Sequence, residues 1–407
     1  MSATAQPSSD VRAPAGNAAA ATVSPALVLA ALVLAALNLR PALSSLSAEL
    51  TDIRNELGLS GFAAGVLTTL PAACMGIFAT LGAPLARRLG VERTLIGGLA
   101  LIGLASAARG LGFGPAAFMV VTLAIGIGIA VVQALGPPIV KAFFARSPGS
   151  PTALFTAGLH GGAMLGAALT VPFTNLFGDW RAGLAVWGLV ALPALVAWTF
   201  IGRRTRISLQ DPNASGTFGV RDLDRGLTVR IMVVLAALAL TFYVPLAWIS
   251  ATYEDAGYSE STAVLLLAIF VGMQAPGALL PALARTPRKR GRTLAVAMGV
   301  AALCLVAIGF ATDTVPALPS AVLGFSSGGA FALALTLPVD HSENPAQAAT
   351  LTGVAFTASY LIAATGPAVA GLLRDATGET ALPLGIVGLG VLCIAPLAWR
   401  LASRHSH

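Results

Sequence analysis

Charged residues are scarce in this sequence. Only 10% of its 407 residues are charged and 56% are hydrophobic, whereas soluble domains carry roughly 25% charged residues. The mean hydropathy is +0.84. A soluble chain of this composition could not cover its surface with polar side chains. The sequence therefore predicts an integral membrane protein whose main solvent is the lipid bilayer.

Cysteine and histidine are also scarce. The three cysteines (Cys74, Cys304 and Cys393) lie in separate apolar runs, and the four histidines cluster neither with them nor with each other. This excludes a disulfide framework or metal-ligand spacing. The sequence also lacks a nucleophile elbow, a phosphate-binding glycine loop and an ATPase signature. We therefore expect no metal, no cofactor and no enzymatic activity.

The first 22 residues are rich in Ala, Ser and Pro and contain a single arginine. A secretory signal needs a basic segment before its apolar core, and that segment is missing. Residues 1–22 are therefore predicted to be a disordered cytoplasmic tail, and residues 403–407 a short tail of the same kind.

Twelve apolar runs are long enough to cross a bilayer, which takes about 20 helical residues. The predicted fold is thus an all-α membrane protein. The runs are 24–48, 61–84, 94–111, 115–139, 152–175, 182–201, 230–251, 262–284, 294–311, 316–338, 348–373 and 382–401.

The basic residues orient these runs. If both termini are cytoplasmic, nineteen of the 24 Lys and Arg residues fall in inner segments and four in outer ones, as the positive-inside rule requires. We expect a multi-pass protein of a bacterial inner membrane. The basic run "RTPRKRGR" (285–292) is explained by topology and anionic lipid headgroups, so no nucleic-acid partner is expected.

An internal repeat occurs at a shift of about 200 residues. Gly58-Leu59-Ser60 matches Gly257-Tyr258-Ser259, Arg93-Thr94-Leu95 matches Arg292-Thr293-Leu294, and Gly188-Leu189 matches Gly388-Leu389. Two parallel halves are a known plan of secondary transporters, with the substrate site between them near the midplane. The repeat predicts two six-helix bundles, 23–202 and 230–402, joined by a cytoplasmic loop, 203–229.

Several segments resemble the major facilitator superfamily. "GAPLARRLGVERTL" (82–95) is similar to the loop after its second helix, although Ala86 stands where an acid is common. More specifically, "NLRPALSSL" (38–46), "GIGIAVVQALGPPIVK" (126–141), "FYVPLAWISATYEDAGYS" (242–259) and "SYLIAATGPAVAGLLRDATGE" (359–379) resemble the branch of cyanate and 2-nitroimidazole transporters. The resemblance implies ATP-independent transport of small molecules and does not fix the substrate.

Arg40 is the most informative residue because it interrupts the first apolar run. A guanidinium in hydrocarbon costs about 3 to 15 kcal/mol. At about 100° per residue, Arg40 shares a helix face with Ser44 and Ser47, and Asn38 lies on the adjacent one. This polar sector predicts a helix that lines an aqueous cavity.

Two interpretations of Arg40 remain open. It could be structural, either reaching toward the interface or pairing with Glu49 or Asp52, or it could bind an anionic substrate through its fixed planar set of donors. The resemblance favours the second, because Arg40 matches the first-helix arginine of that branch. Every Asp and Glu lies in a connection or at a helix end. The substrate or a co-transported ion is then the simplest neutralising partner.

Other polar or aromatic residues of the apolar runs are weaker candidates for substrate contact, each with a packing alternative. His160 is the only histidine in a run and could relay a proton. It lies opposite the stripe Gly158, Gly162 and Gly166, which permits close helix contact. The remaining candidates are Gln133, Tyr243, Trp248, Gln274 and Tyr360.

The sequence therefore predicts a secondary transporter of a small anionic solute that alternates access to a central site. The alternative is an exporter of neutral or drug-like compounds in which Arg40 is structural. A coupling proton or ion is a further candidate partner, and we expect a monomer. A receptor is disfavoured because the longest connection has about 28 residues.

Overall fold

The computed structural model describes residues 23–78, 81–144, 149–205, 220–284, 287–311, 317–343 and 345–403. The predicted tail 1–22, all but Ser403 of the predicted tail 403–407, and most of the predicted loop (206–219) lie outside the described residues; Ser403 is the last residue of α19. Within the described ranges the ordered elements are all helices, because a chain in lipid must satisfy its backbone polar groups internally.

Twelve helical segments of the described chain are long and apolar enough to span a membrane, as predicted. They are Pro25–Ala48, Gly61–Phe78, Val91–Leu111, Pro115–Phe144, Leu154–Phe177, Trp180–Arg204, Arg225–Asp255, Glu260–Gly277, Lys289–Phe310, Ala317–Ala334, Thr350–Thr377 and Ala381–Leu401.

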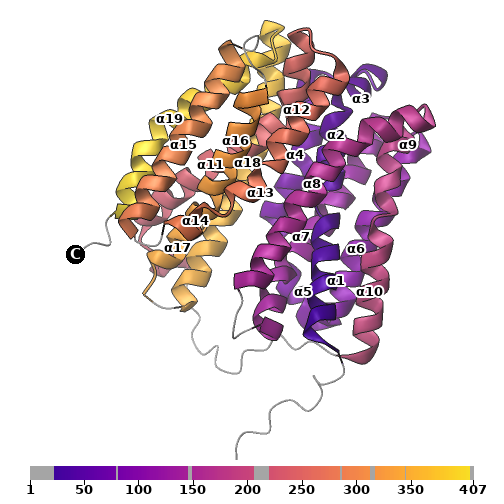
Figure 1. The fold of residues 1–407 in the computed structure, drawn as a ribbon. Coiled ribbons are helices and arrows are strands. Elements are labelled where there is room, and N and C mark those ends of the chain that lie inside the picture. Colours follow the sequence, from indigo (N-terminus) through magenta and orange to yellow (C-terminus); the bar gives the residue numbers. More distant parts are fainter. Residues whose placement is uncertain are drawn as a thin grey trace, which may run out of the picture.

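The first half of the chain folds into one bundle, coloured indigo to magenta in Figure 1. Its helices are α1 (Pro25–Asn38), α2 (Pro41–Ala48), α3 (Leu50–Glu56), α4 (Gly61–Phe78), α5 (Gly82–Leu89), α6 (Val91–Ala108), η2 (Arg109–Leu111), α7 (Pro115–Phe144), α8 (Gly149–Phe177), α9 (Trp180–Ala185), η3 (Val186–Gly188) and α10 (Ala191–Arg204).

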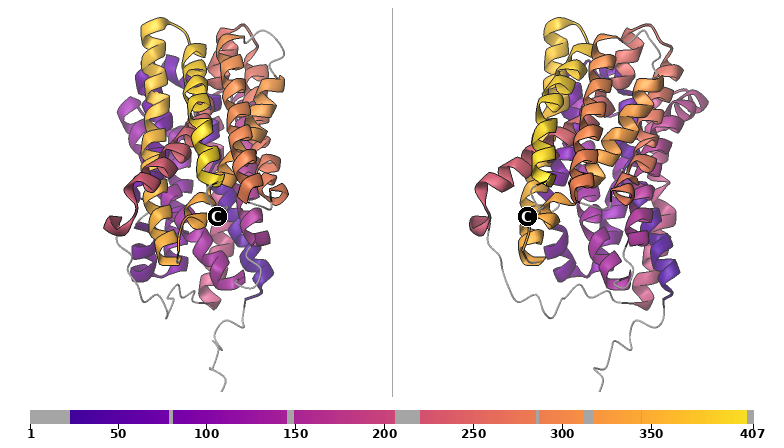
Figure 2. Two further views of the ribbon diagram at one scale, coloured as in Figure 1. Left: turned by 90° about the vertical axis from the view of Figure 1, so that its left-hand side faces the viewer. Right: turned by 60° about the vertical axis from the view of Figure 1, so that its left-hand side comes forward.

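The second half forms the other bundle, coloured from rose to yellow (Figure 2). Its helices are η4 (Val220–Asp222), α11 (Arg225–Asp255), α12 (Glu260–Gly272), α13 (Gln274–Gly277), α14 (Leu280–Leu283), α15 (Pro287–Phe310), α16 (Ala317–Ala334), α17 (Leu337–Asp340), α18 (Pro345–Thr377) and α19 (Ala381–Ser403). α11 thus begins within the segment predicted as the loop between bundles.

Matching glycines show the internal repeat in three dimensions. Gly58 and Gly257 both adopt positive φ angles, 61° and 91°, directly before α4 and α12. Gly188 packs against Gly103 and Ala107 of α6, and Gly388 packs against Ala302 and Val306 of α15. Equivalent positions of the two halves therefore make equivalent turns and helix contacts.

The two bundles meet chiefly along α4 and α18 and along α8 and α12. A Cβ atom on Gly65 would overlap the Pro367 carbonyl, and one on Gly371 would overlap the backbone of Gly61. These glycines let the backbones of α4 and α18 touch, as small residues do between membrane helices.

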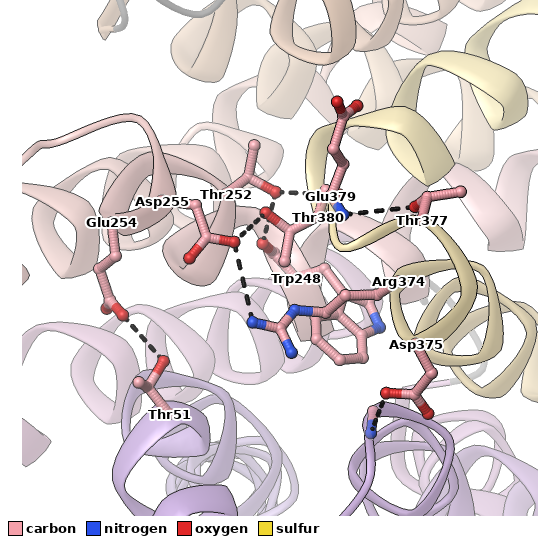
Figure 3. A network of polar contacts seen from close by, with 11 residues as sticks. Thr51, Trp248, Thr252, Glu254, Asp255, Arg374, Asp375, Thr377, Glu379 and Thr380 are labelled. Atoms are coloured by element: carbon pink, nitrogen blue, oxygen red, sulfur yellow. Dashed lines mark hydrogen bonds and ion pairs between the residues drawn. The ribbon is translucent and has the colours of Figure 1, made fainter.

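The bundles converge at the end of the molecule where α3 and α9 lie, called here the α3 end, and diverge toward the opposite α5 end (Figure 1). Thr51 and Asp375 form hydrogen bonds between the bundles at the α3 end (Figure 3). Thr51 Oγ1 donates to Glu254 Oε2 over 2.8 Å. The Asp375 carboxylate accepts the backbone N–H groups of Gly61 (2.8 Å) and Phe62 (2.9 Å). The first turn of α4 is thereby held by the other bundle.

Candidate functional site

The first membrane-spanning segment breaks at Arg40. α1 ends at Asn38 and α2 begins at Pro41, where proline supplies no N–H to continue the helix. Arg40, with φ −117° and ψ −25°, lies at this break. The helix break therefore positions the arginine about two-thirds of the way along the segment Pro25–Ala48.

The serines predicted to share a face with Arg40 bond to backbone carbonyls of their own segment. Ser44 and Ser47, predicted to line a cavity with it, are buried. The Ser44 hydroxyl donates to the Arg40 carbonyl (3.3 Å), and Ser47 donates to the Leu43 carbonyl (3.2 Å). Neither serine is among the residues that line the central cavity described below.

Asn38 does not line the cavity either. Its Nδ2 donates to the carbonyls of Leu34 (2.9 Å) and Val190 (3.0 Å). The side chain is 4% exposed and links α1 to the segment before α10. Both N–H groups of its amide are therefore used, one within α1 and the other in the contact with Val190.

The glycine stripe of α8 makes the close helix contact that the sequence predicted, and its partner is the broken first segment. A Cβ on Gly162 would overlap the Leu37 carbonyl, and one on Gly166 would overlap Ser44 Oγ; a Cβ on Gly158 would lie 3.0 Å from that of Ala36. His160, on the opposite side of α8, points away from this contact and lines a cavity.

This central cavity lies between the two bundles. It is lined by Arg40 and His160 of the first bundle and by Leu238, Ala239, Phe242, Tyr243, Gln274, Ser327, Phe331 and Tyr360 of the second. The centre of a water molecule can occupy about 40 Å³ of it, which is room for a few waters or a small solute. Five of the eight predicted site residues thus meet at one place.

Arg40 contacts the second bundle across this cavity. Its Nη1 donates to the Tyr243 hydroxyl over 3.4 Å, and its guanidinium carbon lies 5.5 Å from the centre of the Phe242 ring. The lining residues include no carboxylate. The fixed positive charge of Arg40 is therefore held by aromatic and hydroxyl groups instead of an opposing acid.

Aromatic rings form one wall of the cavity. The Tyr243 ring lies 5.0 Å from Phe242 and 6.1 Å from Tyr360, in edge-to-face geometry. Phe356 lies behind them, 6.0 Å from Tyr360 and 6.4 Å from Phe331. Rings in such contacts hold each other in place, so the wall presents a rigid apolar surface to a flat solute.

Gln274 supplies an unused donor. It is 5% exposed, and its Nε2 is buried with no hydrogen-bond partner. Gln274 begins α13 directly after α12 ends at Gly272, so this amide also lies at a helix break. A buried donor without a partner is costly, and an acceptor atom of a bound solute would satisfy it.

Two predicted residues lie away from the cavity lining. Gln133 is half-buried in α7, and its Oε1 atom has no hydrogen-bond partner. Trp248 is 2% exposed. Its indole N–H donates to the Pro367 carbonyl over 3.0 Å, and the Arg374 guanidinium lies over its ring (Figure 3). Trp248 therefore joins α11 to α18.

Sequence reasoning missed a second buried arginine. Arg109, assigned to an outer connection, is 1% exposed. Its Nη1 donates to the Ala42 carbonyl (2.9 Å) and its Nη2 to Thr122 (3.2 Å), and it lies 5.6 Å from the Phe118 ring centre. Arg109 thus fixes α2 just after the break that positions Arg40.

It also missed the apolar and hydroxyl lining. Phe242, Phe331 and Ser327 carry no signal in the sequence, because phenylalanine occurs 17 times in this apolar chain. Adjacency to Tyr243 was the one available hint for Phe242.

Comparisons with known proteins agree with this architecture. The profile of the Major Facilitator Superfamily matches residues 26–367. Two Escherichia coli (strain K12) proteins are each 32% identical: the 2-nitroimidazole transporter over 364 residues (88% of this chain, 90% of the relative) and the cyanate transport protein CynX over 366 residues (88% and 94%). The uncharacterized transporter YycB of Bacillus subtilis (strain 168) is 32% identical over 366 residues, 88% of each chain.

Among solved structures, the fold is similar to that of a bacterial homologue of the human lysosomal transporter Spinster. The TM-score is 0.74 at 16% identity, with 94% of this chain and 98% of that one covered. The nucleoside transporter NupG matches with a TM-score of 0.72 at 12% identity, covering 92% and 98%.

The chain is a multi-pass membrane transporter of small molecules. It belongs to the major facilitator superfamily, in the branch that contains the cyanate and 2-nitroimidazole transporters.

Proposed function

We propose that the protein is a secondary active transporter of a small, flat anion, which binds in the central cavity against Arg40. The observation that carries this proposal is a guanidinium facing a cavity whose lining residues include no carboxylate. A bound anion would neutralise this charge in a low-dielectric site, where its attraction is stronger than in water.

The remaining lining fits a flat solute. A guanidinium presents donors in a plane that matches a carboxylate or a similar anion, and the Tyr243 and Tyr360 rings lie beside it. Gln274 adds a donor without a partner. The relatives give the same indication, since one is named for cyanate, and a Thauera aromatica protein 47% identical over 55 residues is named a putative anionic 4-hydroxy-benzoate permease.

Transport would proceed by alternating access. The cavity takes residues from both bundles, so rocking one bundle against the other exposes the site to either side of the membrane. The distribution of basic residues supports an orientation with the α5 end and both termini on the cytoplasmic side of a bacterial inner membrane.

The test uses purified protein with cyanate, benzoate and 2-nitroimidazole as probes. We expect the two anions to raise the thermal unfolding midpoint of the wild type, to do so weakly for Arg40→Lys and not at all for Arg40→Ala. Arg88→Ala, at an exposed position of α5, is the matched control and keeps the wild-type response. Equal anion stabilisation of wild type and Arg40→Ala contradicts the proposal.

One observation supports a second candidate, export of a neutral compound. Four of the ten lining residues have hydrocarbon side chains (Leu238, Ala239, Phe242 and Phe331) and two more are tyrosines (Tyr243 and Tyr360). One relative is named for 2-nitroimidazole. If the second candidate is correct, proteoliposomes that contain Arg40→Ala retain nitroimidazole flux. Neither the wild type nor this variant then transports the probe anions.

A further inference from the structure

Four acidic side chains from both bundles gather at the α3 end, away from the central cavity. Glu49 and Asp52 belong to the first bundle, and Glu254 and Glu260 to the second. Carboxylate oxygens of Glu49, Asp52 and Glu260 all lie within 4.8 Å of one another. Glu254 lies beside them and accepts a hydrogen bond from Thr51, 2.8 Å long. We call Glu49, Asp52, Glu254 and Glu260 the acidic cluster.

Glu49 differs from the other three because it is buried. It lies between α2 and α3 and is 1% exposed, whereas Asp52 and Glu260 are exposed. Its Oε1 accepts the Thr174 hydroxyl of α8 over 2.6 Å, but its Oε2 is buried with no hydrogen-bond partner. An ionised carboxylate with an unpaired buried oxygen carries a large desolvation cost, and a proton on that oxygen removes it.

The charges that act on Glu49 are all acidic. The arginines at this end are engaged elsewhere: Arg181 of α9 pairs with Glu56, Arg374 lies 3.9 Å from Asp255, and Arg54 lies near Asp255 and Asp375. The ionisable groups facing Glu49 from the packed elements are Asp52 on α3, Glu254 on α11 and Glu260 on α12.

We propose that Glu49 is a proton-binding site that couples protonation to closure of the α3 end. With Glu49 neutral, the bundles can bring their carboxylates together. With Glu49 ionised, like charges from the two bundles repel at close range, and the end is driven open. The inference deepens the proposed transport function by naming its coupling ion, and its meaning for transport rests on that proposal.

The electrostatics agree with this geometry. Burial, together with the charges of Asp52, Glu260 and Glu254, raises the pKa of Glu49 to about 7, although the Thr174 hydrogen bond acts to lower it. Opening would hydrate Glu49 and return its pKa toward the ordinary value of roughly 4.3. By linkage, the closed end is favoured most at acidic pH, loses stability as the pH rises through the raised pKa, and is insensitive above it.

A proton fits the cluster better than a metal ion. Ca²⁺ takes about six to eight oxygen ligands, so with one oxygen each from Glu49, Asp52 and Glu260 it would need bidentate binding or several further ligands. One proton satisfies the Glu49 oxygen without further ligands.

The experiment measures closure directly, without substrate. Spin labels on Asn55→Cys and Ala256→Cys, both exposed at the α3 end, are placed in full-length protein with Cys74, Cys304 and Cys393 replaced by alanine. Their distance distribution is recorded in lipid nanodiscs from pH 5 to 8.5. We expect the ratio of closed to open molecules to fall up to about a hundredfold over this range and to level off above about pH 7.

Glu49→Gln mimics the protonated side chain and should stay closed at every pH. Glu56→Gln on the neighbouring α3 is the matched control. Hydrogen bonds from Trp180 and Arg181 hold the pKa of Glu56 below its usual value, so it stays ionised throughout, and the wild-type pH dependence should persist. Thr174→Val removes the hydrogen bond that favours ionised Glu49, and should move the transition to higher pH whether or not Glu49→Gln folds.

The proposal is overturned if the wild-type distances do not depend on pH, if Glu49→Gln keeps the wild-type dependence, or if Thr174→Val leaves the transition in place. It is also overturned if closure at constant pH follows added Na⁺ or Ca²⁺, since the cluster would then bind a metal cation. None of these outcomes bears on anion binding at Arg40, which the thermal unfolding experiment tests separately.

Discussion

Arg40 and Tyr243 meet in the middle of the molecule although 203 residues separate them, with Nη1 3.4 Å from the hydroxyl oxygen. Thr51 and Glu254, 2.8 Å apart at the α3 end, are separated by the same 203 residues. This spacing is close to the internal repeat of about 200 residues. Both pairs therefore join nearly equivalent positions of the two halves, as expected where the first segment of each half lies beside the axis that relates them.

Tyr243 and Trp248 lie one and a half turns apart on α11 and should respond differently to substitution. Tyr243→Phe removes the hydroxyl that Arg40 contacts, and we expect probe anions to bind about three- to tenfold more weakly, since a net hydrogen bond is worth about 1 kcal/mol. Trp248→Phe removes the bond to Pro367 and should lower the unfolding midpoint with little effect on anion affinity. Isothermal titration and thermal unfolding of both variants separate the two roles. Equal losses of affinity would contradict this assignment.

Gln274 should matter for binding more than for stability. Its Nε2 has no partner, so Gln274→Leu removes an unpaired buried donor, and the protein should be as stable as wild type or slightly more so. Anion affinity should fall several-fold, because the donor to the solute is lost. Gln133→Leu, outside the cavity lining, is the matched control, and the affinity measured with it should be unchanged.

Arg109 should be a stability residue. Arg109→Ala leaves the Ala42 carbonyl and Thr122 without their donor and opens a cavity beside Phe118. We expect a loss of about 2–4 kcal/mol in unfolding free energy, measured by denaturation in mild detergent. Arg87→Ala on the exposed surface of α5 should change it by less than about 0.5 kcal/mol. A loss as small for Arg109 as for Arg87 would show that the buried guanidinium contributes nothing.

Asp375 should stabilise the closed α3 end. Asp375→Ala removes the acceptor of two N–H groups in the other bundle, and we expect about 1–2 kcal/mol less stability for closure, a five- to thirtyfold shift toward open molecules. The spin-label pair described above measures this shift. Asp179→Ala is the control, because Asp179 caps α9 within its own bundle and should leave the distance distribution unchanged.

The sequence predicted the twelve spans because span length and hydropathy are local properties. It also indicated Arg40, His160, Tyr243, Gln274 and Tyr360, since a polar or amphipathic side chain in an apolar run is rare enough to notice. It could not place Asn38, whose partner Val190 lies 152 residues away. Hydrogen bonds of this kind depend on which helices become neighbours.

The sequence also could not predict which side chains at the ends of spans are buried. Glu49 and Arg109 both lie near the ends of spans, where the sequence suggests hydrated connections, yet each is 1% exposed. Contacts with other helices accompany this burial: Thr174 of α8 hydrogen-bonds Glu49, and Arg109 donates to Ala42 of α2 and Thr122 of α7. The depth of a residue in the bilayer can be predicted from its position within a span. Whether water reaches its side chain depends on which helices pack around it.

The capping of α4 bears on the rate of the proposed transport cycle. Its leading amides are divided between Ser60, which accepts from Ala63 within the same chain segment, and Asp375, which belongs to the opposite bundle. Under the proposed alternating access, each turnover would detach Asp375 from these amides and later restore the contact, while Ser60 would keep the first turn of α4 capped. A helix cap usually only fixes the residue at which a helix begins. The cap that Asp375 supplies to α4 would also contribute to the energy barrier of each transport cycle.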